Sequence, residues 1–506
     1  MSRIVIIGAG PTGLGAAYRL RELGHEDFVV LEAGRGPGGL ASSESTARGF
    51  TYDIGGHVLF SHFRYFDELF DRVMGSDYQE ILREAWIWIL GRFLPYPFQN
   101  NVKDLPREAL QECVLGVVRA QRAGKTDFEN FEQMILGIFG EGIAKHFMMP
   151  YNFKVWAHPP RMLATGWIGE RVPVVDLERM LTNVIMDRAD ISWGPNNTFK
   201  YPRAGGTGGL FTRIAAPLEP DIRYGARVTG VDARRRYVTL EDGTREGYDL
   251  LISTAPVDRL VQSMDDAPVG VREAAGQLLH SGSAIVGVGV RQPSPSTKCW
   301  MYFPESDCPF YRVTYLSNYS ADVVPDPATH YSLLAEVSFS PHKPVQRETV
   351  VEEVIDGFVR TGLLSPGDRA DIVDTHLILR DYTYPIPSLR RDDALAAIQP
   401  FLESRGIYSR GRFGAWKYEI GNMDHSVQMG AEVVDRLIDN RPELCWTGKI
   451  LPKNEQTLGL LPVDTLPGST DEGRGVSPPR PDASSGFFRP DPPPHDRKRP
   501  LENRTE

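Results

Sequence analysis

RIVIIGAGPTGLGAAYRLRELG, residues 3–24, places a short apolar stretch before a glycine-rich turn and an amphipathic segment. RIVIIGAG predicts a buried strand and GLGAAYRLRELG a helix, and the next segment, DFVVLEA, predicts a second strand. The turn has the spacing GxGxxG. Its glycines permit a tight bend, room for a pyrophosphate and close packing of helix on strand, while the helix N-terminus offers N–H groups to the phosphate. The stretch therefore predicts the first βαβ unit of a Rossmann-like fold and a dinucleotide site.

The residues after this unit favour FAD over a nicotinamide dinucleotide. Glu32 ends the second predicted strand, where a carboxylate can accept hydrogen bonds from ribose hydroxyls. The glycine pair Gly38-Gly39 follows, as is typical of flavoproteins. Residues 225–255 predict a hairpin and a strand that return to the first sheet, as in flavoproteins of the two-dinucleotide type. The cofactor residues predicted from these parts of the chain are Gly8, Gly10, Gly13, Glu32, Gly38, Gly39, Leu40 and Val228.

Composition limits the classes of partner. The chain has 506 residues, a net charge of −10 and a pI near 5.7, which argues against a nucleic acid or an anionic membrane as the partner. The four cysteines form no CxxC pair, so we expect buried free thiols and no metal site. Neither a signal peptide nor an apolar run of 18 residues is found, so we expect a cytoplasmic protein without a membrane span.

Changes of pattern along the chain predict an α/β protein. We expect a Rossmann-like FAD-binding domain, an inserted helical domain, an antiparallel β-sheet substrate domain and a disordered Pro-rich tail. The predicted FAD-binding parts are residues 1–100, 223–283 and 406–447; the helical domain is 101–195; the β-sheet parts are 196–222 and 284–405; the tail is 448–506. Asp424 or Ser426 is the predicted N-cap of the last helix.

Seven segments resemble the eukaryotic-type UDP-galactopyranose mutases, and the similarity runs from residue 3 to about residue 440. The segments are GFTYDIGGHVLFSHFRYFD (49–67), PYPFQNNVKDLP (95–106), MPYNFKVWA (149–157), GERV (169–172), FKYPRAGGTGGL (199–210), KCWMYFPESDCPFYR (298–312) and RGRFGAWKYEIGNMDHS (410–426). The resemblance implies interconversion of UDP-galactopyranose and UDP-galactofuranose without net redox change. In that reaction N5 of reduced FAD is the nucleophile at the anomeric carbon. A cofactor nucleophile agrees with the lack of a recognisable catalytic triad.

The resemblance also implies the residues that hold the UDP group. Arg171 and Arg312 match the two substrate arginines of the family, and fixed cations are what a pyrophosphate dianion requires. Three tyrosines match its pyrophosphate donors: Tyr302, Tyr384 and Tyr418. Tyr96, Phe98 and Gln99 match the uridine pocket. Asn152, Trp156, Asn196 and Phe60 match positions near the nucleotide and the sugar.

A second set of matched residues faces the flavin ring. Gly55 and Gly56 would let the loop approach the ring and present His57 to it, where the imidazole can bond differently to oxidised and reduced flavin. The last helix would point its N-terminus at the ring and stabilise the anionic reduced form. Arg412, Asn422, Met423 and Ser426 are the matched residues there. Met423 departs from the family, in which we expect glutamine.

Four questions stay open in the sequence. NADPH is a candidate reductant, because Arg83 and His62 match positions linked to its docking, but Ala85 stands where we expect serine. The sugar could be a relative of UDP-galactose, since small groups change discrimination only modestly. An FAD oxidase of the amine-oxidase type and a catalytically idle flavoprotein are the alternatives. The family includes monomers and tetramers, so the oligomeric state is not predicted.

Overall fold

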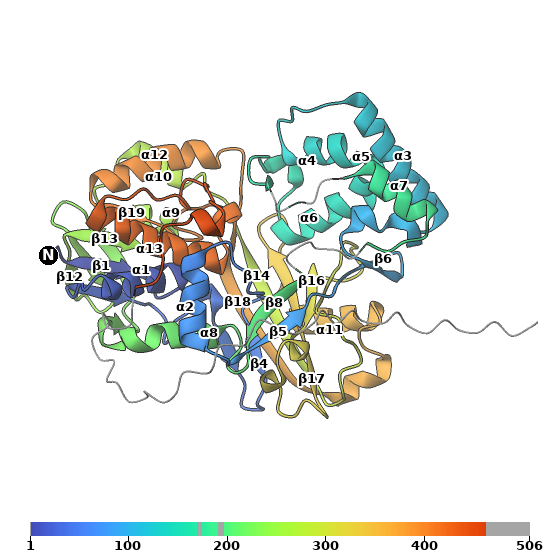
Figure 1. Ribbon diagram of the computed structural model, residues 1–506, viewed down its shortest axis with the longest axis horizontal. Coiled ribbons are helices and arrows are strands. Elements are labelled where there is room, and N and C mark those ends of the chain that lie inside the picture. Colours follow the sequence, from blue (N-terminus) through green and yellow to red (C-terminus); the bar gives the residue numbers. More distant parts are fainter. Residues whose placement is uncertain (1, 170–171, 173–174, 191–196, 462–506) are drawn as a thin grey trace, which may run out of the picture. The chain divides into compact units, whose positions relative to one another are not determined.

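A computed structural model describes residues 2–169, 172, 175–190 and 197–461 of the chain (Figure 1). Within these ranges the chain forms a parallel Rossmann-like sheet, a large second sheet and a group of helices. The predicted α/β fold class is therefore confirmed.

Five short strands form the Rossmann-like sheet. Their order is β19-β13-β1-β2-β9, and every neighbouring pair is parallel. Two of them are buried at every residue and two more at all but one residue, and these four consist mainly of apolar residues, as expected for a parallel sheet covered on both faces. The strands are β1 (Ile4–Ile7), β2 (Phe28–Leu31), β9 (Ile222–Arg223), β13 (Leu250–Ser253) and β19 (Ile407–Ser409).

Helices cover both faces of this sheet. Alternate residues of β1 enter two cores: Ile4 and Ile6 pack on one side, Val5 and Ile7 on the other. The first core includes α1 (Pro11–Glu22), α2 (Arg64–Met74), α8 (Gly208–Ala215) and α13 (Met423–Asp439). The second includes α9 (Val257–Gln262), α10 (Val269–Ala275) and α12 (Arg391–Ser404), together with the antiparallel strands β10 (Val228–Asp232) and β11 (Tyr237–Leu240). Strand β12 (Arg245–Gly247) pairs with β11.

The second sheet has seven strands in the order β18-β14-β17-β16-β15-β6-β7. All neighbouring pairs are antiparallel except β15 and β6, which are parallel. The strands are β6 (Ala85–Ile89), β7 (Arg92–Pro95), β14 (His280–Val290), β15 (Trp300–Tyr302), β16 (Arg312–Tyr315), β17 (Tyr331–Phe339) and β18 (Ile372–Pro385). Helix α11 (Val350–Arg360) packs its apolar residues into the core on one face.

Helices α3 to α7 lie together at the upper right of Figure 1. They are α3 (Arg107–Ala123), α4 (Phe131–Met134), α5 (Gly140–Ile143), α6 (Met149–Trp156) and α7 (Leu177–Ile185). Two short pairs of strands, β3 (Ser43–Ser45) with β4 (Thr51–Asp53) and β5 (Tyr78–Leu82) with β8 (Thr198–Pro202), complete the elements used below.

Several elements cross the boundaries that the sequence pattern suggested. Strands β6 and β7 lie within residues 1–100 but belong to the second sheet. Helix α8 follows β8 in the range 196–222 but packs in the first Rossmann core, and α12 packs in the second core although the range 284–405 was assigned to the β-sheet domain. The reason is physical: an amphipathic segment packs on whichever apolar surface the chain brings near it, and composition does not record that surface.

The C-terminal part also differs from the prediction in two ways. The N-cap of α13 is Asn422, with no side-chain cap bond, because Asp424 already lies inside the first turn. Residues 448–461, which composition assigned to the tail, pack on the first Rossmann core: Leu458 is buried there, and Gln456 accepts from the backbone N–H of Arg64. Residues 462–506 of the predicted tail lie outside the described residues. All four cysteines are buried and free, as predicted.

Candidate active site

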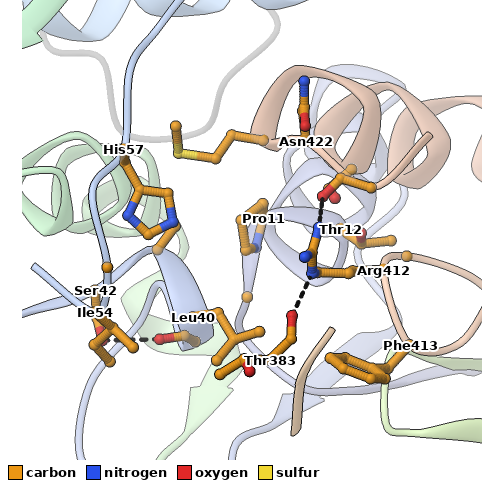
Figure 2. A pocket seen from close by; sticks show the side chains of 18 of the residues that line it. Pro11, Thr12, Leu40, Ser42, Ile54, His57, Thr383, Arg412, Phe413 and Asn422 are labelled. Carbon is orange, nitrogen blue, oxygen red and sulfur yellow. Dashed lines mark hydrogen bonds between the residues drawn. The ribbon is translucent and has the colours of Figure 1, made fainter. Parts of the chain in front are cut away.

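A cavity of ≈ 2660 Å³ opens where the glycine turn, the second sheet and the N-terminus of α13 meet (Figure 2). This is several times the roughly 300–1,000 Å³ of ordinary ligand pockets, so there is room for more than one ligand. We call residues 8–12 and 31–43 the glycine wall. Tyr302, Arg312, Tyr384 and Tyr418 form the arginine–tyrosine wall.

The glycine wall fits a dinucleotide phosphate through its backbone. A Cβ atom at Gly13 would lie 1.8 Å from the carbonyl oxygen of Gly8, and Gly8 itself has a φ of +98°, so neither position accepts a side chain. A Cβ at Gly39 would lie 3.3 Å from Cα of Gly10, so the second glycine pair closes on the first turn. This close backbone approach is what the GxGxxG spacing predicted.

Glu32 orders the same wall. Its carboxylate accepts from the backbone N–H of Ala9 at 2.7 Å and of Gly34 at 2.6 Å. The carboxylate therefore joins the first turn to the segment after β2, and its remaining lone pairs can still accept from a ribose. Leu40 and Val228 line the cavity nearby, while Gly13 and Gly38 support the turn from behind. The donor set and the glycine cradle fit FAD.

Two helix N-termini point toward the cavity. Helix α1 begins after Gly10 with Pro11 in its first turn, and α13 begins after Asn422; neither has a side-chain cap. Uncapped N–H groups at a helix N-terminus form a ready site for an anion. Met423 and Ser426, predicted to face the flavin, both line the cavity in the first turn of α13.

The loop Gly55-Gly56-His57 forms another side of the cavity. Gly55 has a φ of +91°, and a Cβ at Gly56 would lie 2.7 Å from Oγ1 of Thr314. Figure 2 shows His57 across the pocket from Arg412 and Asn422. Burial lowers the pKa of His57, so its imidazole is neutral, and its Nδ1 atom is buried without a hydrogen-bond partner among the described residues. An unpartnered polar atom at this position is suited to a ligand.

The arginine–tyrosine wall brings side chains together from separate elements. Arg312 on β16 donates through Nε and Nη2 to Glu336 on β17, at 2.5 and 2.9 Å. The hydroxyls of Tyr384 and Tyr311 are 2.9 Å apart. Burial raises the pKa of Tyr384 to about 12, so its hydroxyl keeps its proton.

Arg412 lies beside this wall. Its guanidinium stands 5.2 Å from the ring centre of Tyr384 and 5.4 Å from that of Tyr418. Nε donates to the carbonyl oxygen of Thr383 and Nη1 to that of Gly421. The arginine thereby joins the end of β18 to the loop that precedes α13, which places its charge between the two tyrosines and the α13 N-terminus.

The structure separates the predicted uridine and sugar residues into two groups. Tyr96 and Phe60 line the cavity. Phe98, Gln99, Asn152 and Trp156 are buried behind the wall. Phe98 stacks on Phe147 with ring centres 4.9 Å apart, and the indole N–H of Trp156 donates to Asn152. Because aromatic side chains pack together here, these four residues support the wall in this structure. Arg171 and Asn196 lie outside the described residues.

The reductant-linked positions share the same cavity. His62 and Arg83 both line it, and Arg83 stands 4.9 Å from the ring centre of Trp300. Ala85 is buried on β6. Arg83 and His62 thus share one cavity with the glycine wall, although no motif joins them.

Sequence reasoning missed a cluster around His62, on the segment that follows the Gly55-Gly56-His57 loop. Asp424 accepts from Nδ1 of His62 at 2.8 Å and from Nδ1 of His425 at 2.9 Å. Burial alone would raise the pKa of Asp424, but these hydrogen bonds hold it below its ordinary value. The three donor atoms lie within 4.8 Å of one another, a spacing also found in metal sites. Here the Nδ1 atom of each of the two histidines donates to the Asp424 carboxylate, and the cluster joins the His62 loop to α13.

Glu336 was missed as well, although the sequence carries a signal for it. It is a charged residue within YSLLAEVSF, a strand that is otherwise apolar or small and is buried almost throughout. A buried carboxylate in such a strand requires donors from its neighbours, and here they come from two other segments of the chain, β16 with its preceding tyrosine and the Gly56 loop.

Comparison with known proteins gives the family and the fold. The NAD(P)-binding Rossmann-like domain family matches residues 6–73. A crystal structure of a reduced UDP-galactopyranose mutase is 42% identical, with a TM-score of 0.85; the match covers 89% of this chain and 98% of that one. None of the helices within the described ranges has the length and apolar character needed to cross a bilayer.

More distant structures share the fold alone. A protein assigned as a protoporphyrinogen oxidase from Exiguobacterium sp. 255-15 is 18% identical with a TM-score of 0.67, covering 87% of this chain and 99% of that one. Cyclohexylamine oxidase from Brevibacterium oxydans IH-35A is 16% identical with a TM-score of 0.59, again covering 87% and 99%.

Proposed function

Because this chain belongs to the UDP-galactopyranose mutase family, we propose that it interconverts UDP-galactopyranose and UDP-galactofuranose with no net redox change. Its family makes it a flavin-dependent mutase. The observation that supports the finer assignment is the arginine–tyrosine wall, which shares one cavity with the glycine wall. A cation with several phenolic donors suits a pyrophosphate, whereas the oxidation of a neutral amine does not require it.

In this proposal the cofactor and the residues of the arginine–tyrosine wall have different roles in the reaction. When bound in its reduced form, FAD supplies the nucleophile, its N5 atom, for the anomeric carbon. Arg312, Tyr302, Tyr384 and Tyr418 bind the UDP group and keep it in the cavity between its release from the sugar and its return. Fixed cations and hydroxyls act before and after bond cleavage without solvent reorganisation, which is the main source of electrostatic catalysis.

The flavin side of the site serves the reduced state. The uncapped first turn of α13 provides N–H groups and positive potential to an anionic ring. His57 is neutral and has an unpartnered Nδ1 atom, so it can bond to the ring without adding charge. Arg412 holds the preceding loop in place.

NADPH is the reductant in this proposal. Arg83 and His62 line the cavity with the glycine wall, and a cavity of ≈ 2660 Å³ can hold a second nucleotide. Anaerobic mixing of the oxidised enzyme with NADPH in a stopped-flow instrument should bleach the flavin absorbance within seconds. Bleaching by dithionite but not by NADPH would remove this part of the proposal.

The main test is conversion of UDP-galactofuranose by the purified enzyme after anaerobic reduction with dithionite, followed by chromatography of the nucleotide sugars. We expect UDP-galactopyranose to appear only with reduced enzyme and the flavin to stay reduced. No conversion would overturn the proposal.

Two further results would redirect the proposal. Conversion of another UDP-furanose in place of UDP-galactofuranose would assign a different sugar to the same reaction. Stoichiometric peroxide with an amine in air would assign the enzyme to the oxidases.

A further inference from the structure

Glu336 occupies an unusual position in the second sheet. Its side chain is 4% exposed, in the middle of β17. Four hydrogen bonds reach its carboxylate: Arg312 donates through Nε at 2.5 Å and Nη2 at 2.9 Å, the hydroxyl of Tyr311 donates at 2.7 Å, and the backbone N–H of Gly56 donates at 3.1 Å. Burial alone would raise the pKa of Glu336, but the Arg312 charge lowers it below its ordinary value, so the carboxylate is ionised.

These bonds fix the orientation of Arg312. Nε and Nη2 are turned toward Glu336, and Nη2 also donates to the carbonyl oxygen of Gly56 at 2.9 Å. Among the described residues, Nη1 of Arg312 has no acceptor, and the side chain lines the cavity. A guanidinium held in a bidentate pair presents its remaining N–H groups in a fixed plane. Glu336 therefore determines which edge of Arg312 meets an anion.

The same carboxylate orients Tyr384 through Tyr311. The single hydroxyl proton of Tyr311 points to Glu336 at 2.7 Å, so the Tyr311 oxygen is left to accept from Tyr384 at 2.9 Å. The hydroxyl of Tyr384 is thereby held toward the Arg312 side of the wall. Two members of the arginine–tyrosine wall thus depend on one buried carboxylate.

The loop before His57 is attached to this network from both sides. Gly56 donates its N–H to Glu336 and accepts at its carbonyl oxygen from Arg312. A Cβ at Gly56 would lie 2.7 Å from Oγ1 of Thr314 and 3.4 Å from Oε1 of Glu336, so glycine is needed for the loop to approach. The backbone that presents His57 and the arginine that meets the anion share a hydrogen bond.

We propose that Glu336 is a positioning residue that couples the anion site to the flavin-facing loop. The proposal rests on the mutase function proposed above. An anion at Nη1 attracts the same guanidinium whose Nη2 donates to the carbonyl oxygen of Gly56, so occupancy of the anion site changes the bonding of the loop that carries His57. By linkage, reduction of the flavin and binding of UDP then change each other's free energy by the same amount.

The coupling is measured in the FAD-loaded enzyme with UDP as the probe. The flavin potential is determined with and without saturating UDP for the wild type and for Glu336→Gln, which keeps the shape and one acceptor but removes the charge. A tenfold difference in UDP affinity between the redox states corresponds to a shift of about 30 mV for a two-electron couple. We expect a UDP-dependent shift in the wild type and its loss in Glu336→Gln, with full FAD content.

Asp374→Asn provides a matched control. Asp374 is a buried carboxylate on β18 that accepts from the hydroxyl of Tyr52 at 3.1 Å and does not line the cavity. A merely structural role for Glu336 would make the two variants alike: both would lose thermal stability and both would keep the UDP-dependent shift. A shift of wild-type size in Glu336→Gln, with kcat/KM unchanged, would overturn the proposal.

A second variant covers the case in which Glu336→Gln does not retain FAD. Tyr311→Phe leaves the Arg312–Glu336 pair intact and removes only the hydroxyl between Glu336 and Tyr384. We expect it to change UDP affinity several-fold, because Tyr384 then loses the acceptor of its hydroxyl proton; unchanged UDP affinity would count against the proposal. Failure of the mutase function would be seen separately, because the wild type would then not convert UDP-galactofuranose even though its UDP-dependent shift could still be compared with that of Glu336→Gln.

Discussion

The two walls of the cavity are built from different parts of the chain. The glycine wall comes from two neighbouring stretches, residues 8–12 and 31–43, and offers backbone atoms and helix N–H groups to a ligand. The arginine–tyrosine wall takes one side chain each from β15, β16, β18 and the loop before α13. Its members are separated by up to 116 residues between Tyr302 and Tyr418.

The difference shows two ways in which a site is specified. In the glycine wall the requirement is the absence of side chains, since a Cβ at Gly13 would collide with the backbone of Gly8. In the opposite wall each side chain needs a neighbour that holds its rotamer, as Glu336 holds Arg312. A substitution in the first wall should therefore abolish binding by steric exclusion of the ligand. A substitution in the second wall should lower activity through loss of charge and orientation while the fold persists.

The largest expected effect is on the glycine wall. Gly13→Ala places a methyl group 1.8 Å from the carbonyl oxygen of Gly8, so the turn must open and FAD binding should fall to near zero. FAD content is read from the absorbance of the purified protein. Gly270→Ala is the control, because a Cβ there has no neighbour within 4 Å. Full FAD content in Gly13→Ala would show that the two walls do not differ in this way.

Arg312→Ala tests the opposite wall and should give the next largest effect. Removing one fixed donor to a developing charge costs about 10²–10³ in kcat, so turnover should fall by at least that factor while the protein stays yellow. Thermal stability should fall as well, because Glu336 is left buried without its partner. Arg21→Ala, which breaks an ion pair with Asp221 outside the cavity, is the control. Loss of FAD from Arg312→Ala would assign the arginine a structural role.

The stability of the protein should depend on pH through a residue that lies outside both walls. Glu432 lies on α13 away from the cavity, and burial raises its pKa from 4.5 to about 7. The folded protein keeps a proton there that the unfolded chain loses. Its contribution to stability is therefore full below pH 4.5 and declines by about 3 kcal/mol as the pH rises to 7.

Glu432→Gln should remove this decline, so it should unfold at a higher temperature than the wild type at pH 8 and not at pH 4.5. Activity per bound FAD should be unchanged, because neither wall is touched. An identical pH dependence of thermal unfolding in the two proteins would contradict the assignment.

The contrast between the walls also explains what the sequence could predict. The GxGxxG turn, Glu32 and the parallel sheet follow from local spacing, because a backbone-made site is encoded where it is built. Glu336 and Asp424 could not be placed from spacing, since their partners approach only after the second sheet and α13 have assembled. Phe98 and Trp156 match a ligand pocket by sequence, and in this structure aromatic neighbours bury their side chains behind the cavity wall, so their contact with a ligand stays a prediction.

The smallest expected effect lies where the two walls meet, at His57. Its imidazole is neutral and its Nδ1 atom has no partner among the described residues, so in the proposed function we expect it to contribute one hydrogen bond to the flavin that differs between redox states. A net hydrogen bond contributes about 0.5–1.5 kcal/mol, which equals about 10–30 mV for two electrons. His57→Ala should lower the flavin potential by that amount, because the bond stabilises the reduced ring.

FAD content should stay full in His57→Ala, since the glycine wall is intact, and turnover should fall less than in Arg312→Ala. His146→Ala, which removes an imidazole paired with Glu112 outside the cavity, controls for a general effect of losing histidine. If His57→Ala keeps both the potential and the rate of the wild type, the imidazole has a packing role, and the flavin-facing loop acts through the Gly56 backbone alone. In that case the coupling between the anion site and this loop would depend entirely on the hydrogen bonds of Glu336.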